Sequence, residues 1–235
     1  MSLNYAFIFA RGGSKGIKNK NIRLFNGKPL IYYSIKLAKK ISSIKKVFVS
    51  SDNKKILDIA KKFGAETILR PKSIAKDNSP EIEAWKHAVN YLKKKKDYFD
   101  NFICLPCTSP LRISKDIILA LKKIKNNNDI VLGISATNKS PNFNMVKKFR
   151  KRVKLLSKKK ILHSRQEADK TYNLTTIIYA CRYKYILNIR KSFWDGNVKY
   201  IEIPKIRSID IDDIIDFRIA EFIYKNKKKM KLKLN

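Results

Sequence analysis

The stretch YAFIFARGGSKGIKNKN, residues 5–21, joins an apolar run to a loop that carries three glycines, a serine and four cations. A short apolar run that ends at glycine is typical of a buried strand. Glycine lets the backbone approach a ligand closely, and successive N–H groups beside lysine and arginine suit an anion such as phosphate. The stretch therefore predicts an anion-binding loop at the end of a buried strand. A tight turn that carries solvated cations is the alternative.

The rest of the chain alternates between strand-length apolar runs and segments of helical periodicity. The expected strands lie at 5–10, 46–50, 66–69, 101–105, 129–134, 174–180 and 199–203. The expected helices lie at 29–40, 53–64, 81–94, 114–125, 182–189 and 213–225. Because this alternation is typical of βαβ units, we predict a single α/β domain, residues 1–235, with a mostly parallel sheet flanked by helices.

The segment 136–172 interrupts the alternation. It contains hairpin-like fragments and little helical periodicity. A structureless loop of this length is uncommon inside a compact domain. We therefore expect an insertion, either a lid or a dimerisation arm.

The chain is strongly basic, with 54 Lys and Arg against 19 Asp and Glu and a formal net charge of +35. The lysines are spread over nearly every expected helix and turn, which favours a solvated surface over a dedicated polyanion site. The field of so many cations should still attract anionic substrates. We expect nucleic acid to bind only nonspecifically.

Membrane and export signals are missing from the sequence. No apolar run approaches the roughly 18 residues that cross a bilayer, and the apolar run at 5–10 has no basic leader. Cys104, Cys107 and Cys181 suit a reducing compartment, and the single CxxC pair is too little for a zinc site. We expect a cytoplasmic protein without a membrane partner.

Three further motifs follow expected strands, at the edge where open α/β sheets bind ligands. SSD at 50–52 suits either a ligand contact or a helix cap. LPCTSPLR at 105–112 offers hydroxyl groups and an arginine to an anionic or hydroxylated ligand, or simply precedes a helix. The glycine loop itself matches neither GxxxxGK[ST] nor GxGxxG, which disfavours P-loop phosphate transfer and dinucleotide binding.

The third motif is RSIDIDDIIDF at 207–217, which contains Asp210 and Asp212. Side chains two residues apart in an extended segment face the same way. Two carboxylates on one side form a platform for Mg²⁺ in a site that binds phosphate. The alternative is that Asp212 or Asp213 caps the last helix.

In this order the motifs resemble those of the acylneuraminate (nonulosonate) cytidylyltransferase family. The resemblance covers nearly the whole chain, and ARGGSKGIKNKNI, TSPLR and RSIDIDDIIDFRIAEF together make it specific. It implies a Rossmann-like fold of the nucleotidyltransferase type, a homodimer, and a dimerisation segment at 136–172. It further implies that CTP and an acidic nine-carbon 2-keto sugar give a CMP-sugar and pyrophosphate, with Mg²⁺ or another divalent cation as cofactor.

The resemblance also implies residue roles, position by position. The nucleotide-binding positions are Arg11, Gly12, Gly13, Ser14, Lys15, Lys20, Asn21, Arg70 and Asp77. The positions associated with the sugar or its pocket are Ser109, Arg112, Arg165, Gln166 and Thr175. The catalytic candidates are Arg11, Lys20, Asp210 and Asp212, of which the two aspartates match the metal-binding pair. We expect Lys20 to stabilise charge on the phosphoryl oxygens, and Asp212 and a metal-bound hydroxide are the alternatives for a general base.

The chain departs from the sialic-acid members of the family in three places. It has LPCTSPLR where they usually have LQPTSPLR, LTTIIY at 174–179 where they have LNGAIY, and Glu81 where serine is common. LPxTSPLR together with TTxxY resembles the branch that activates legionaminic acid. Sialic acid, pseudaminic acid and the eight-carbon 3-deoxy-manno-octulosonate are alternative substrates. An alternative of another class is a polyanion-binding or nucleic-acid-binding protein.

Overall fold

The computed structural model, which describes residues 2–157, 162, 164–189, 192–227 and 229, has a central sheet of seven strands. In sheet order these are β11 (Asn197–Glu202), β7 (Asp129–Thr137), β10 (Thr171–Arg182), β6 (Asn101–Cys104), β1 (Asn4–Phe9), β4 (Ile44–Ser51) and β5 (Glu66–Leu69). Strand β10 is antiparallel to both of its neighbours, and the other neighbouring pairs are parallel. Strand β1, which precedes the glycine loop, therefore lies in the interior of the sheet.

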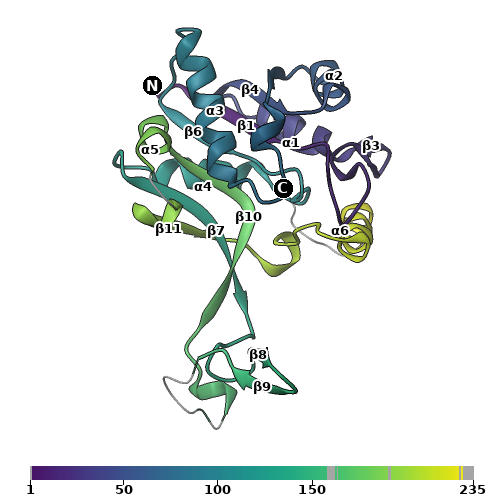
Figure 1. Ribbon diagram of the computed structural model, residues 1–235, viewed down its shortest axis with the longest axis vertical. Helices are drawn as coiled ribbons and strands as arrows, with labels where there is room; N and C mark the ends of the chain where they lie inside the picture. The colour runs from purple at the N-terminus through teal and green to yellow at the C-terminus, as the bar shows by residue number, and fades with distance from the viewer. Residues whose placement is uncertain (1, 158–161, 163, 190–191, 228, 230–235) are drawn as a thin grey trace.

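Helices cover both faces of this sheet (Figure 1). Apolar residues of α1 (Leu30–Lys39), α2 (Lys54–Lys62), α4 (Ser114–Lys123) and α6 (Ile214–Asn226) share a core with one face. Apolar residues of α3 (Glu81–Lys94) and α5 (Tyr183–Asn188) share a core with the other. The three layers confirm the predicted α/β fold with a mostly parallel sheet flanked by helices.

Strand β1 shows why its sequence is apolar from Tyr5 to Phe9. Ala6 and Ile8 face the core of α1, whereas Phe7 faces the core of α3. The Phe7 ring centroid lies 4.6 Å from that of Phe102 on β6 and 5.4 Å from that of Phe48 on β4. A parallel strand that is buried on both faces has a continuous hydrophobic run rather than an alternating one.

The expected strands and helices are all present, with ends that differ by a few residues. The largest difference is β10, which begins three residues earlier than the expected strand at 174–180 and is antiparallel. The direction follows from the connection, because the chain leaves the sheet at the end of β7 and returns beside it. Strands joined in this way run antiparallel.

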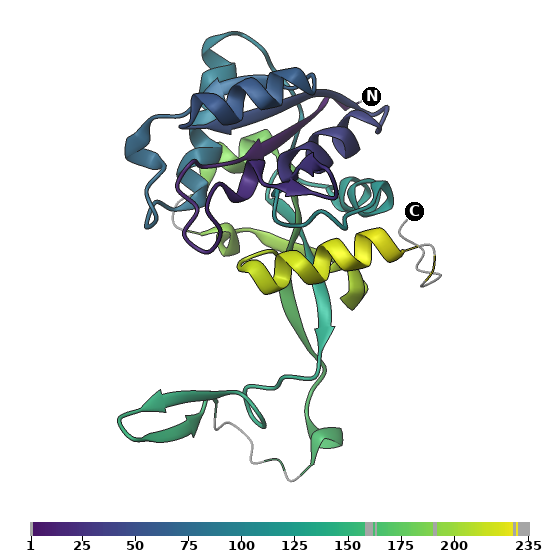
Figure 2. The same cartoon turned by 90° about the vertical axis from the view of Figure 1, so that its right-hand side faces the viewer.

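Strands β7 and β10 continue as a ribbon that carries an arm away from the body of the protein (Figures 1 and 2). The arm contains the hairpin of β8 (Val146–Phe149) and β9 (Arg152–Leu155) and a 3-10 turn at Arg165–Glu167. Large apolar side chains are exposed along it, namely Val146, Phe149, Val153, Leu156, Tyr172 and Leu174. The arm coincides with the insertion expected at 136–172, of which residues 158–161 and 163 lie outside the described part of the chain.

A buried carboxylate joins the edge strand β11 to the sheet. The Asp129 side chain is 0% exposed and accepts hydrogen bonds from Lys199 Nζ at 2.6 Å and Asn197 Nδ2 at 2.8 Å. It also accepts the backbone N–H groups of Lys125 and Asn126 at 2.7 and 2.8 Å. Burial alone would raise the pKa of Asp129, but these partners outweigh it and lower the pKa to about 2.

Asp129→Asn is expected to flatten the dependence of stability on pH in acid. The pKa of about 2 in the folded protein lies below the value of about 3.9 for an unperturbed aspartate. In the wild type, ionised Asp129 therefore adds about 1–2 kcal/mol to the free energy of unfolding. This contribution is present above about pH 4 and is lost as the pH falls toward 2. Urea unfolding at pH 7, 4 and 2.5 measures it. An Asn variant that loses stability between pH 4 and 2.5 as steeply as the wild type would assign the acid sensitivity to another group.

Two further features concern the cysteines and the character of the helices. All three cysteines are buried and form no disulfide, and burial raises the pKa of the Cys107 thiol to about 12. Within the described ranges, no helix combines the length and the apolar character that a membrane span requires.

Candidate functional site

A cavity of about 370 Å³ lies next to the glycine loop. Its lining comes from segments that follow the carboxyl ends of strands, including Arg11 after β1, Arg70 after β5 and Thr108 after β6. Ligands bind at this edge in open α/β sheets. Of the predicted nucleotide-binding residues, the cavity is lined by Arg11, Ser14, Lys15, Lys20, Asn21, Arg70 and Asp77.

The loop is held in place by neighbours on three sides. The Gly12 N–H donates to Asp52 Oδ1 at 2.9 Å, and Asn21 Nδ2 donates to the carbonyl of Arg11 at 3.0 Å. A Cβ atom on Gly12 would lie 2.9 Å from the side chain of Asn53, so the loop packs directly on the start of α2. SSD at 50–52 therefore supports the loop through Asp52, and Asn53 caps α2 by accepting the N–H groups of Lys55 and Ile56.

Two cations of the loop are paired with one carboxylate. Asp77 forms ion pairs with Arg11 and with Lys15, the latter at 2.7 Å. The hydrogen bond from Lys15 is the largest effect on the pKa of Asp77, and it lowers that pKa. Desolvation, the next largest effect, opposes it, and the pKa is lowered overall. Asp77 thus neutralises and positions Arg11 and Lys15. A bound phosphate would interact with these two cations rather than with Asp77.

Lys20 connects the loop to the segment that carries the paired aspartates. Its Nζ donates to the carbonyl of Ile211 at 2.6 Å and lies 3.7 Å from Asp212 Oδ1. The lysine side chain is 14% exposed, so its charge is partly shielded from solvent. This position, between loop and aspartates, suits a cation that faces phosphate oxygens.

The segment 203–213 holds Asp210 and Asp212 against the sheet edge. Ile211 N–H donates to the carbonyl of Thr108 at 2.9 Å, and Arg207 forms a buried ion pair with Asp116 of α4. Asp213 caps α6 by accepting the N–H groups of Ile215 and Asp216. The capping alternative is therefore realised by Asp213, and Asp212 lines the cavity beside Lys20.

Asp210 and Asp212 occupy different environments. The Asp212 side chain is 81% exposed, whereas Asp210 Oδ1 is buried and has no hydrogen-bond partner in the described structure. Burial raises the pKa of Asp210, the hydroxyl groups of Thr108 and Thr176 hydrogen-bond to it, and the charge of Asp212 raises it further. An unpartnered carboxylate oxygen beside a second carboxylate fits a divalent cation, because the cation would remove both penalties. No cluster of three acidic, His or Cys ligands occurs among the described residues.

Arg70 and Glu81 line the same cavity as Asp212. Arg70 is 7% exposed, its Nε has no partner among the described residues, and burial lowers its pKa. Burial by surrounding protein raises the pKa of Glu81, although the residue is solvent-accessible through the cavity. Sequence analysis noted Glu81 only as a departure, and the structure places it within the site.

Thr108 and Thr176 were missed by the sequence analysis. Both hydrogen-bond to Asp210, and Thr176 Oγ1 lies 2.8 Å from Ser109 Oγ. Ser109 is 1% exposed and thus lies behind Thr176. Thr175, which was predicted on the sugar side, is 3% exposed and packs toward Gly133 of β7. Its neighbour Thr176 lies beside Asp210. Because two threonines are adjacent in the sequence, either of them could have been the one that faces the site.

Arg112 also lies elsewhere than predicted. Its guanidinium donates to the carbonyl groups of Ile177 and Pro106 and to Ser34 Oγ, and the residue is 5% exposed. It does not line the cavity of the glycine loop. Arg112 therefore holds the TSPLR loop to β10 and α1, and we remove it from the sugar contacts.

Arg165 and Gln166 belong to the 3-10 turn in the arm, which extends away from the sheet (Figure 2). Gln166 is exposed. Among the described side chains, Gln166 does not line the cavity.

Comparison with known proteins gives the family. The family model described as cytidylyltransferase matches residues 5–228, which is nearly the whole chain. The chain belongs to the cytidylyltransferase family. The match includes the glycine loop, the TSPLR loop and the aspartate segment described above.

Two relatives and one solved structure are similar to this cytidylyltransferase. Post-translational flagellin modification protein B of Campylobacter coli is 33% identical, over 94% of this chain and 94% of that protein. CMP-N,N'-diacetyllegionaminic acid synthase of Campylobacter jejuni subsp. jejuni serotype O:2 is 32% identical, over 92% of each. The structure of a CMP:2-keto-3-deoxy-manno-octonic acid synthetase complexed with CTP has a TM-score of 0.72 at 16% identity, and the match covers 96% of this chain and 100% of that one. The relatives confirm the acylneuraminate (nonulosonate) cytidylyltransferase family, and the solved structure confirms the nucleotidyltransferase-type fold.

Gly16→Ala is expected to damage this cytidylyltransferase at the contact between loop and aspartates. An added Cβ would lie 2.1 Å from the backbone oxygen of Asp212, and backbone atoms cannot turn aside as a side chain can. We expect kcat/KM for CTP to fall by about 10- to 100-fold, which corresponds to about 1.4–2.8 kcal/mol. Lys18→Ala is the control from the same loop, because Lys18 is exposed and does not line the cavity. Equal activities of the two variants would contradict the close contact at Gly16.

Proposed function

We propose that this cytidylyltransferase joins CTP to legionaminic acid or a derivative of it, giving the CMP-sugar and pyrophosphate. The observation that carries the proposal is the meeting, in one cavity, of the glycine loop, Lys20 and Asp212 of the aspartate pair. A relative that is named as a diacetyllegionaminic acid synthase supports the choice of sugar. So does the TTxxY sequence of β10, whose second threonine lies beside Asp210.

The proposed mechanism uses positioning and charge. The N–H groups of the loop and the cations Arg11, Lys15 and Lys20 bind the triphosphate. The anomeric hydroxyl of the sugar attacks the α-phosphorus, and pyrophosphate leaves. Lys20 faces the phosphoryl oxygens and stabilises their developing charge, held there by its hydrogen bond to the Ile211 carbonyl.

Asp210 and Asp212 would hold the divalent cation, with Mg²⁺ as our first choice. When bound, such an ion neutralises phosphate charge and polarises the P–O bonds. The fit rests on the buried, unpartnered Oδ1 of Asp210 and the neighbouring carboxylate of Asp212. Thr108 and Thr176 orient the Asp210 carboxyl group by hydrogen bonding to it.

We further propose a homodimer formed by the arm. The exposed apolar residues of the arm, among them Phe149 and Val153, would be covered by a second copy. In such a dimer Arg165 and Gln166 would reach the site of the partner, which explains why one chain leaves them far from its own cavity. Free thiols support a cytoplasmic location, and the charge of +35 supports weak, salt-sensitive binding of polyanions.

The test of the reaction is pyrophosphate release from CTP and Mg²⁺ with each sugar in a separate reaction. Legionaminic, N-acetylneuraminic, pseudaminic and 3-deoxy-manno-octulosonic acids are compared. Release that needs both CTP and legionaminic acid, at a kcat/KM at least tenfold above the other sugars, is the expected result. A preference for another sugar would overturn the proposed substrate. If no sugar gives pyrophosphate release, the proposed reaction is overturned, and polyanion binding becomes the function to measure.

Arg165→Ala is expected to raise the KM for the sugar by about tenfold or more and to leave the KM for CTP nearly unchanged. The physical reason is the loss of a cation that would meet the sugar carboxylate from the partner's arm. Initial rates with each substrate varied in turn measure both constants. Light scattering in parallel must show the same dimer for variant and wild type. A sugar KM within twofold of wild type would remove Arg165 from the pocket.

A further inference from the structure

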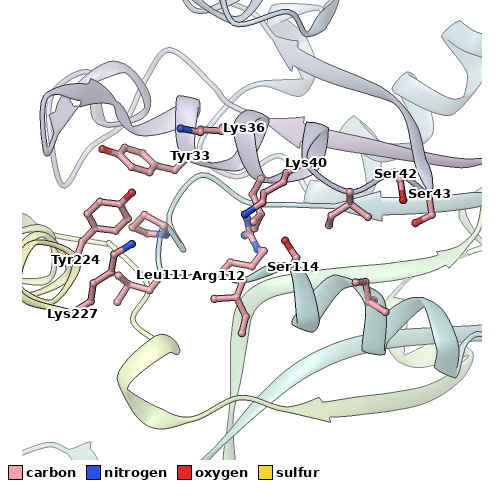
Figure 3. A pocket seen from close by; sticks show the side chains of 15 residues that line it. Tyr33, Lys36, Lys40, Ser42, Ser43, Leu111, Arg112, Ser114, Tyr224 and Lys227 are labelled. Carbon is pink, nitrogen blue, oxygen red and sulfur yellow. The ribbon is translucent and has the colours of Figure 1, made fainter. Parts of the chain in front are cut away.

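A second cavity, of about 800 Å³, lies between α1, the segment 110–114 and the end of α6 (Figure 3). Among the described residues it shares no lining residue with the nucleotide cavity. Its volume falls in the range of pockets that bind organic ligands. The TSPLR loop separates the two cavities, with Thr108 on one side and Leu111 on the other.

The charge of this second cavity is entirely positive. Lys36, Lys40 and Lys227 line it together with Arg112, and none of its lining residues is Asp or Glu. Figure 3 shows the lysines arriving from α1 on one side and from the end of α6 on the other. Glu221 of α6 does not offset them, since it pairs with Lys225 and Arg218 and accepts the Asn26 N–H.

Arg112 adds a charge that is buried rather than solvated. It donates to two carbonyl groups and a hydroxyl group, and no carboxylate forms an ion pair with it among the described residues. Burial lowers the pKa of Arg112 to about 10, so the nearby charges of Asp116 and Asp210, which raise this pKa, give the buried cation only partial compensation. A negative charge in the adjacent cavity would supply that compensation.

The remaining surface of the cavity is apolar. Leu37, Ile41, Leu111, Ile113 and Ile118 contribute to its wall, and Ile118 is 40% exposed. An inorganic anion would leave this wall in contact with water. A ligand with both an anionic group and an apolar body would satisfy the cations and cover the wall.

We propose that this cavity is a second ligand site, which binds an organic anion with an apolar body. The anionic group meets Lys36, Lys40 and Lys227, and the apolar body lies on Leu37 and Ile118. The site is independent of the nucleotide cavity, so it stays available when CTP is bound.

The first experiment measures binding of 1-naphthyl phosphate by fluorescence and calorimetry, with saturating CTP and Mg²⁺ present. Inorganic phosphate and 1-naphthol are the two halves of the probe. We expect one site per chain for naphthyl phosphate and an affinity at least tenfold above that of either half. No binding of naphthyl phosphate in the presence of CTP, or equal affinity for inorganic phosphate, would overturn the proposal.

The second experiment places the probe by mutation. The double variant Lys36→Glu, Lys40→Glu is expected to weaken naphthyl phosphate by at least tenfold. Lys61→Glu, Lys62→Glu is the matched control, since these exposed lysines also lie in the last turn of a helix, α2. Ile118→Gln is expected to weaken the binding of naphthyl phosphate but not the binding of inorganic phosphate. Thermal melts check that all variants fold. If the Lys61→Glu, Lys62→Glu control binds naphthyl phosphate equally weakly, the loss of affinity comes from the overall charge of the protein and the proposed site is wrong.

Two sources of such a ligand are separated by competition. Decyl phosphate presents an alkyl body and CMP presents a nucleoside body. Displacement of naphthyl phosphate by either one, in the presence of saturating CTP, identifies the body that the apolar wall accepts. If neither displaces the probe, the proposed ligand class is wrong.

Discussion

Asp210→Asn is expected to lower kcat by about 10²-fold or more while the folded protein becomes no less stable. Asparagine keeps the shape of the side chain and can still hydrogen-bond to Thr108 and Thr176, but it removes the charge that a divalent cation needs. Because the pKa of Asp210 is raised in the folded state, its ionised form opposes folding at neutral pH when no cation is bound. The variant should therefore melt at the same or a higher temperature than the wild type in metal-free buffer.

Two measurements separate this outcome from simple damage. Pyrophosphate release gives kcat, and thermal unfolding with and without CTP and Mg²⁺ gives the stabilisation by ligand, which the variant should largely lose. Asp58→Asn, on the exposed part of α2, is the matched surface control. Activity within threefold of wild type would remove Asp210 from the site. A melting temperature well below wild type would show a structural role instead.

Lys20→Met is expected to lower kcat by about 10²–10³-fold. Methionine keeps much of the aliphatic stem and loses the charge that faces the phosphoryl oxygens. It also loses the 2.6 Å hydrogen bond to the Ile211 carbonyl, so the loop and the aspartate segment are no longer tied. The KM for CTP should rise as well, because the same cation contributes to binding the triphosphate.

The control for Lys20 comes from the same loop. Lys18 is exposed and does not line the cavity, so Lys18→Met removes one charge of the loop without touching the site. Steady-state kinetics at two salt concentrations compares the variants, since long-range attraction alone is screened by salt. Equal losses in both variants would assign the effect to the overall field rather than to the position of Lys20.

Local sequence was sufficient for most of the fold. The continuous apolar run of β1 required burial on both faces, and the amphipathic helices between strands required a sheet to cover. The glycine loop and the SIDID segment were recognisable because each has a local composition that few other sites need. Their meeting through Lys20, Ile211 and Asp212 was an expectation that only the tertiary structure could place in space.

The sugar-side residues show the limit of local patterns. Thr175 and Thr176 are chemically identical, and the register of β10 on β7 shifts between Thr175 and Tyr179. In a strand, neighbouring residues point to opposite faces, so the register decides which threonine reaches Asp210. Arg112 has a sequence context that suits ligand binding, but acceptors from β10 and α1 bury its guanidinium.

The sequence by itself determined the order of strands and helices, the glycine loop, the paired aspartates and the family, because each depends on residues that are close together in the chain. Only the tertiary structure decided that Asp210 is buried with an unpartnered oxygen, that Asp77 pairs with the loop cations and that Arg112 is structural. It also decided that a second, cationic cavity forms between α1 and α6. Burial and pairing depend on segments far apart in the sequence, and no local pattern records which of them will meet.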